Sequence, residues 1–180
     1  FSAFFSTASI ILIYITIKKI WQNSLLAILG AFFLAFSPTF IQMAHFAITE
    51  SLLVFWLLLL LFFSLKTIKN PDWKNYFKIG FISGLALATK VSAISFLIIP
   101  FTAYFLNHLK NLKIFYQYLF SLLISFLTFS FFSPYVFLDK ENFWRSMNYE
   151  NGVVLGKLAV PYTLQFEKTF TYLFQIKNFL

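Results

Sequence analysis

The chain has 180 residues, of which 60% are hydrophobic and 11% charged, and its formal net charge is +8. With a mean hydropathy of +0.80, its apolar surface exceeds what a soluble domain of this size buries, which predicts an integral membrane protein. The basic residues are scattered in short loops between apolar runs, so we expect them to report membrane orientation and not nucleic-acid binding. The absence of cysteine from the sequence excludes disulfides and thiolate metal sites.

The first residue of the chain is Phe1 and not Met, and no basic segment precedes the first apolar run. Phe1 is therefore not expected to be a native start or the beginning of a signal peptide. We expect the sequence to be part of a longer protein.

Six apolar stretches are predicted to be transmembrane helices, since a helix needs about 20 apolar residues to cross the hydrocarbon core. Five approach that length. The region from Tyr76 to Leu109 is ambiguous, because it forms either one long tilted helix or two short ones that turn near Lys90. The expected spans are Phe1 to Ile17, Ser24 to Ile41, Ile48 to Leu65, Tyr76 to Thr89, Ser92 to Leu109 and Ile114 to Leu138.

The lysines favour six spans over five. With six, the loop lysines fall on one side, which the positive-inside rule makes cytoplasmic; with five, the last pair moves to the opposite side. These residues are Lys18, Lys19, Lys66, Lys69, Lys74, Lys78, Lys110 and Lys113. We therefore predict that Phe1 enters from the outer side of the membrane and that Leu138 leaves on that side.

The composition changes after Leu138. Residues 1–138 are predicted to form a transmembrane helical core and residues 139–180 an extracytoplasmic segment, because no stretch in the latter is long and apolar enough to span. Within this segment Phe166, Phe170, Leu173 and Ile176 recur at helical spacing. That pattern predicts an amphipathic helix lying in the membrane interface.

A polar cluster separates the second and third apolar runs. On a continuous helix Gln42, His45 and Thr49 share one face, with Glu50 beside them. Glu50 is the only acid between Phe1 and Lys66, and an isolated acid at membrane depth is a functional candidate. Such a face can bind a cation, a sugar hydroxyl or a phosphate. The alternative is that the chain turns here and its polar residues simply meet water.

Two cations are further candidates. Lys90 departs from the positive-inside pattern by facing outward, where it either attracts an anionic lipid phosphate or snorkels at the end of a short helix. Arg145, the only arginine, suits bidentate contact with phosphate or carboxylate, although a Trp-Arg pair such as Trp144-Arg145 is also an ordinary membrane anchor. Gly-rich phosphate loops and the metalloprotease and hydrolase motifs are missing, so hydrolase and nucleotide-binding functions lose support.

Four groups of residues follow one another in a characteristic order and spacing. They are Phe1-Ser2-Ala3 with Ile11-Leu12-Ile13-Tyr14 and Lys18-Lys19, then Ala35-Phe36-Ser37-Pro38, then His45-Phe46-Ala47-Ile48-Thr49-Glu50-Ser51-Leu52-Leu53, then Gly84-Leu85-Ala86-Leu87-Ala88-Thr89-Lys90. Together, over Phe1 to Pro134, they resemble the membrane core of bacterial glycosyltransferases of the family 39 type. These enzymes are relatives of the protein O-mannosyltransferases and the lipid A aminoarabinose transferases.

The resemblance implies part of a GT-C helix bundle in the cell membrane. It implies an enzyme that moves a hexosyl or pentosyl group from a polyprenyl-phosphate carrier to an acceptor on the outer side, with membrane lipid and the lipid-linked sugar as partners. It specifies neither sugar nor acceptor, and a divalent metal is a possible cofactor. The rival interpretation is a piece of a polytopic transporter, with Glu50 and Lys90 lining the substrate path.

The resemblance also distributes roles among the candidate residues. Glu50 stands where relatives often carry Asp after Thr, which implies an accessory acid in the outer cavity, while Lys90 or Arg145 would face the carrier phosphate. Gln42, His45 and Thr49 are the expected substrate contacts beside Glu50. The main acid of the family lies in the first outer loop, expected upstream of Phe1, so we do not expect the chain alone to be active.

Overall fold

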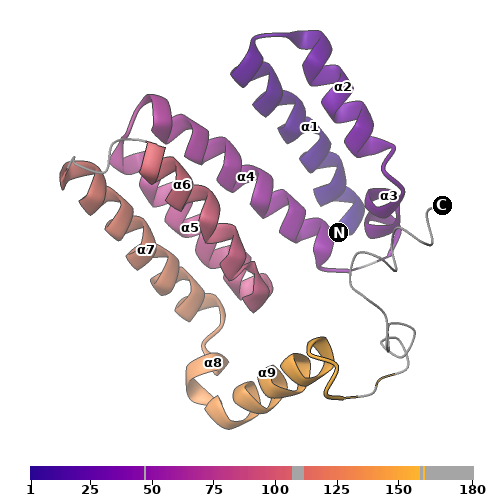
Figure 1. The fold of residues 1–180 in the computed structure, drawn as a ribbon, viewed down its shortest axis with the longest axis vertical. Coiled ribbons are helices and arrows are strands. Elements are labelled where there is room, and N and C mark those ends of the chain that lie inside the picture. The colour runs from indigo at the N-terminus through magenta and orange to yellow at the C-terminus, as the bar shows by residue number, and fades with distance from the viewer. Residues whose placement is uncertain (47, 107–111, 159, 161–180) are drawn as a thin grey trace. The chain divides into compact units, whose positions relative to one another are not determined.

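The computed structural model describes residues 1–46, 48–106, 112–158 and 160. The described part of the chain is helical and contains no strand, which confirms the predicted all-α class. The elements are α1 (Ser2–Trp21), α2 (Ser24–Ala35), α3 (Pro38–His45), α4 (Glu50–Lys69), α5 (Trp73–Thr89), the 3₁₀ helix η1 (Val91–Leu97), α6 (Ile98–Leu106), α7 (Leu112–Phe132), α8 (Tyr135–Leu138) and α9 (Lys140–Val154) (Figure 1). The amphipathic helix predicted around Phe166 to Ile176 lies outside the described residues.

The chain divides into two compact units, Phe1–Ser133 and Pro134–Leu180. We predicted the change of organisation at Asp139, five residues later. The difference arises because α7 ends at Phe132, ahead of Ser133 and Pro134. The residues up to Leu138 then form the short helix α8, which belongs to the second unit.

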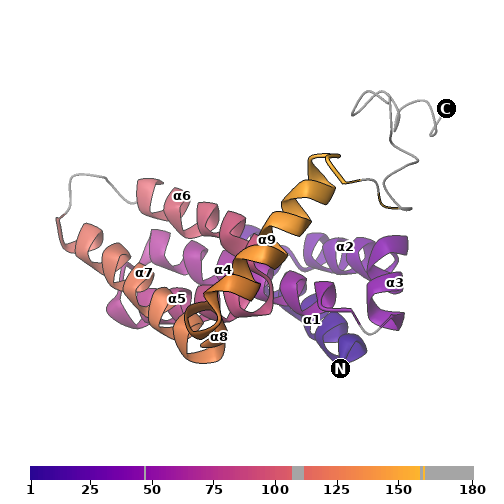
Figure 2. The same cartoon turned by 90° about the horizontal axis from the view of Figure 1, so that it is seen from below.

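The helices of the first unit lie side by side and alternate in direction (Figures 1 and 2). The ring centroid of Phe5 lies 5.2 Å from that of Phe55, and the Lys19 ammonium lies 4.9 Å from the Phe62 ring centroid. Helices α1 and α4 are therefore parallel and adjacent, and α2 runs back along the other side of α1 (Figure 1). In the same way α5 and α7 are parallel, because Gly80 packs on Ser121 and Gly84 on Ser125.

This alternation gives the first unit two chemically different ends. One end, here called the lysine end, contains the last turns of α1 and α4 and the first turns of α5. Its cations include Lys18, Lys19, Lys66, Lys69, Lys74 and Lys78. The opposite end, here called the Glu50 end, contains the start of α4 and the end of α5.

Three described helices are long and apolar enough to cross a membrane: α1, α4 and α7. Helices α2 and α3 together form a fourth candidate, bent by 60°. Large apolar side chains are exposed along the unit, whereas small hydroxyl residues such as Ser9 and Thr16 are buried and bond to carbonyl oxygens of their own helix. Buried small polar residues and an apolar exterior are the arrangement expected in lipid. The six-span topology remains a prediction.

Two expectations about proline and helix continuity meet different outcomes. We predicted one helix over Ser24 to Ile41 with Pro38 inside it; instead α2 ends at Ala35 and Pro38 is the first residue of α3. Proline suits this position because the first helical N–H needs no partner within the helix. Pro100 does lie within a helix, α6. The region from Tyr76 to Leu109 has the two-segment form, interrupted at Lys90.

Helices α5 and α7 make a close contact through two glycines. A Cβ atom on Gly80 would meet the Ser121 carbonyl oxygen, and one on Gly84 would lie 2.5 Å from the Thr128 Cβ. Only glycine lets the two backbones approach this closely, as in other membrane helix pairs with small residues four apart. The contact fixes the position of α5, and with it the placement of Lys90 at the end of that helix.

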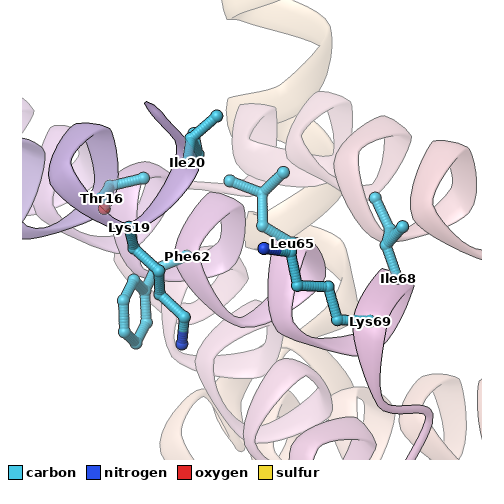
Figure 3. Close-up of a pocket in the computed structure, with 7 residues that line it drawn as sticks. All are labelled: Thr16, Lys19, Ile20, Phe62, Leu65, Ile68 and Lys69. Carbon is cyan, nitrogen blue, oxygen red and sulfur yellow. The ribbon is translucent and has the colours of Figure 1, made fainter. Parts of the chain in front are cut away.

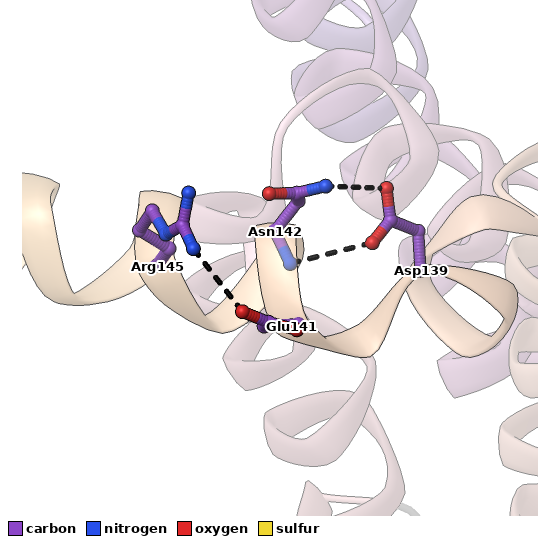
Figure 4. Close-up of polar contacts among 4 residues, drawn as sticks. All are labelled: Asp139, Glu141, Asn142 and Arg145. Carbon is purple, nitrogen blue, oxygen red and sulfur yellow. Dashed lines mark hydrogen bonds and ion pairs between the residues drawn. The ribbon is translucent and has the colours of Figure 1, made fainter.

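The second unit contains α8 and α9. The Asp139 carboxylate caps α9 by accepting a hydrogen bond from the Asn142 backbone N–H at 3.4 Å and another from its side-chain amide at 2.9 Å (Figure 4). One turn into the helix, Arg145 pairs with Glu141 at 3.1 Å. Both side chains of that pair are exposed.

Candidate functional site

Glu50 is placed by a break between two helices. Helix α3 ends at His45, Phe46 is extended, and α4 begins at Glu50 with Thr49 as its N-cap residue. The first turn of a helix presents unpaired N–H groups and the positive end of the helix dipole, so a carboxylate is favoured there. The Thr49 hydroxyl donates a further hydrogen bond to Glu50 Oε2 at 3.4 Å.

Lys90 is placed by the break between α5 and η1. Its backbone is extended, with φ −157° and ψ 126°, yet it remains tied to both segments: its N–H donates to the Ala86 carbonyl at 3.0 Å and its carbonyl accepts from the Ala93 N–H at 2.9 Å. This bridging position holds the side chain at the junction. The ammonium group lies where the first turn of α4 begins.

Glu50 and Lys90 form an ion pair across 40 positions of sequence. The distance from Lys90 Nζ to Glu50 Oε1 is 3.0 Å, and the side chains of Lys90 and Glu50 are 51% and 35% exposed. The sequence singled out both residues but did not predict that they pair. Because both groups remain accessible, a soluble or lipid-linked anion can reach the ammonium.

Trp56 and Thr89 hold the two helices together beside this pair. The Trp56 indole N–H donates to the Thr89 hydroxyl at 3.2 Å, and that hydroxyl donates to the Leu85 carbonyl at 2.8 Å. Trp56 also packs against the buried cluster of Leu53, Ala86 and Ala93. This contact was not predicted, since nothing in the sequence links a tryptophan inside an apolar run to a threonine 33 positions later.

The other predicted site residues are placed differently. Gln42 and His45 are exposed on α3, and that helix ends before Thr49, so the predicted common face of the three residues is wrong. Among the described residues no hydrogen bond joins Gln42 or His45 to Glu50. Helices α3 and α4 are connected instead through Ser51, whose buried hydroxyl donates a hydrogen bond to the Met43 carbonyl at 2.7 Å.

Arg145 belongs to the second unit, where its described partner is Glu141. Metal coordination was left open by the sequence. In the described ranges no three histidine, aspartate or glutamate side chains come together as a metal site would require.

The fold and this site define a helical membrane protein with an accessible ion pair at one end of its first unit. Residues 1–136 match the dolichyl-phosphate-mannose-protein mannosyltransferase family, and the chain belongs to that family. No curated protein and no solved structure matches the chain. The match supports a glycosyltransferase that takes its sugar from a lipid-linked donor, and it confirms the mannosyltransferase part of the resemblance. It includes Glu50 and Lys90, whereas Arg145 lies beyond it.

Proposed function

We propose that this chain forms part of the membrane core of a glycosyltransferase that moves a sugar from a polyprenyl-phosphate carrier to an acceptor on the outer side of the membrane. The Glu50 end of the first unit would receive the phosphate of the donor. Family membership supports the reaction class. The observation that carries the assignment of the site is the Glu50–Lys90 ion pair, whose accessible ammonium lies where α4 begins and α5 ends.

In the proposed reaction an acceptor oxygen attacks the anomeric carbon of the sugar. The bond from that carbon to the phosphate oxygen breaks, its electron pair leaves on the polyprenyl phosphate, and the acceptor proton passes to a carboxylate base. Negative charge grows on the phosphate as the bond breaks, so a fixed cation nearby stabilises the transition state. Lys90 is the residue that would supply this charge.

Glu50 would act as an accessory to Lys90 and not as the base. Its carboxylate holds the ammonium in place when no donor is bound, and an accessible ion pair is worth only about 0–1 kcal/mol, so a phosphate can displace it at little cost. By the family resemblance, the principal acid would come from a loop upstream of Phe1. Gln42, His45 and Thr49, all exposed near this end, would contact sugar hydroxyls.

The test uses the full-length protein in proteoliposomes with a radiolabelled polyprenyl-phosphate mannose as donor. Lys90→Gln should lower transfer by about 100-fold, the size of effect seen when one preorganised group that stabilises developing charge is removed. The matched control is Lys74→Gln, which removes the same charge from the lysine end and should leave the rate unchanged. Wild-type turnover in the Lys90→Gln protein would return Lys90 to an ordinary snorkelling lysine.

A further inference from the structure

The lysine end of the first unit contains a cavity between α1 and α4. Its volume is about 120 Å³, and Phe62, Leu65 and Ile68 of α4 form much of its wall, with Lys19 and Lys69 among its lining residues (Figure 3). The hydroxyl of Thr16, which also lines it, already donates to the Leu12 carbonyl at 2.7 Å. The polar groups that the lining has left to offer a ligand are thus the two ammonium groups.

The charges around this cavity are not balanced. The positive charges of Lys66 and Lys69 both repel that of Lys19. The ammonium groups of Lys19 and Lys66 lie 4.9 and 5.2 Å from the centroid of the same Phe62 ring. In the described part of the chain no carboxylate pairs with any of these three lysines. A ring face offsets only part of their mutual repulsion. An external anion would relieve the rest.

The shape and lining of the cavity restrict the kind of anion. Sites that enclose a soluble small molecule have volumes of roughly 300–1,000 Å³, so this cavity admits only part of a ligand, and its walls are apolar. It lies where two membrane-length helices end, and the ends of helices that cross a bilayer are at the depth where lipid headgroups meet acyl chains. A ligand that matches has a negatively charged group next to an apolar chain.

We propose that this cavity binds an anionic phospholipid of the surrounding bilayer, with its phosphate between Lys19 and Lys69 and an acyl chain against Phe62 and Leu65. Basic pockets between membrane helices bind anionic headgroups in this way. The bound lipid would bridge the last turns of α1 and α4. The site lies at the opposite end of the first unit from Glu50 and is independent of the sugar donor.

Native mass spectrometry of the full-length protein can test this by comparing retained dioleoyl-phosphatidylglycerol with dioleoyl-phosphatidylcholine, which differ only in headgroup. The wild-type protein should retain the anionic lipid preferentially. A lysine near an anionic headgroup contributes about a fivefold gain in affinity. The double variant Lys19→Gln/Lys69→Gln should therefore lose about 25-fold in relative retention, while Lys19→Arg/Lys69→Arg keeps the preference.

The matched control is Lys74→Gln/Lys78→Gln, which removes two charges from the same end but outside the cavity. It should keep the preference for phosphatidylglycerol. Equal losses in the control and the cavity variant would show a diffuse surface effect and overturn the proposal, as would equal retention of both lipids by the wild-type protein. Tighter retention of polyprenyl phosphate that depends on Lys19 and Lys69 would assign the cavity to the carrier and also overturn it.

Discussion

The two ends of the first unit are built from the same helices but differ in whether their charged side chains are paired. At the Glu50 end one acid meets one base at 3.0 Å, so the site is close to neutral when empty. At the lysine end no carboxylate among the described residues pairs with Lys19, Lys66 or Lys69, and the ammonium groups of Lys19 and Lys66 lie over the same Phe62 ring. At the Glu50 end the cation is neutralised by its own carboxylate, so the ion pair must open before an external anion binds. At the lysine end, where the described residues supply no carboxylate to the cavity, only an external anion can neutralise its cations.

This difference suits the Glu50 end to a substrate that binds and leaves, and the lysine end to a ligand that stays bound. A ligand at the Glu50 end displaces a weak, accessible ion pair, so it can bind and leave at little cost, as turnover requires. A ligand at the lysine end relieves repulsion and is not displaced by any internal group. A long-lived structural ligand suits the second situation better than a substrate does.

The largest expected effect comes from reversing the pair. The double variant Glu50→Lys/Lys90→Glu keeps an ion pair of opposite direction, so its thermal unfolding should stay near wild type. A carboxylate would then stand where we place the donor phosphate, and transfer in proteoliposomes should fall by at least about 100-fold. The single variant Glu50→Lys, which brings two cations together, serves as the control for stability. An active double variant would mean that the pair has only a structural role.

The next effect concerns the contact that positions Lys90. Gly80→Ala should destabilise the protein by about 1–3 kcal/mol, because the added Cβ meets the Ser121 carbonyl of α7, which belongs to backbone and cannot move aside. Unfolding followed by circular dichroism in detergent measures this. Gly30→Ala is the matched control: its Cβ meets only the flexible end of the Ile17 side chain, so stability should hold or rise. Equal effects at both positions would contradict the close contact.

Sequence patterns predicted the helical class and singled out the residues of the ion pair. An isolated acid and an outward-facing lysine in apolar surroundings are each costly enough to notice. Their pairing was beyond reach, because it depends on the direction and register of α4 and α5. Those are set by contacts distant in sequence, such as Gly80 on Ser121 and Trp56 on Thr89.

The helix breaks show a second limit. The hydropathy of the apolar run over Ser24 to Ile41 did not indicate a helix break at Ser37, yet the chain turns there by 60°. Hydropathy measures suitability for lipid but does not specify a straight helix, and Pro38 is compatible with both a kink and a helix start. A second break, between the end of α3 at His45 and the start of α4 at Glu50, removed Thr49 from the predicted face of Gln42 and His45.

A smaller effect is expected for the hydrogen bond beside the ion pair. Trp56→Phe removes the indole donor to Thr89 but keeps an aromatic ring in the cluster, so the loss of stability should be about 1 kcal/mol. If this bond also positions Lys90, the KM for the donor should rise a few-fold while the pH dependence stays unchanged. Trp73→Phe, at the lysine end, is the control, and it should leave the KM alone. An unchanged KM in the Trp56 variant would show that Trp56 contributes to packing and does not position Lys90.

The smallest effect is predicted at the lysine end, and it depends on the lipid. In phosphatidylcholine nanodiscs Lys69→Gln should change the free energy of unfolding by no more than about 0.5 kcal/mol, since it removes an exposed charge and some repulsion. In phosphatidylglycerol nanodiscs the wild-type protein should gain thermal stability and the variant should gain less. Added salt should weaken the wild-type gain, because screening acts on the ammonium–phosphate attraction. An equal gain in both proteins would show that anionic lipid acts on the whole surface and not through this cavity.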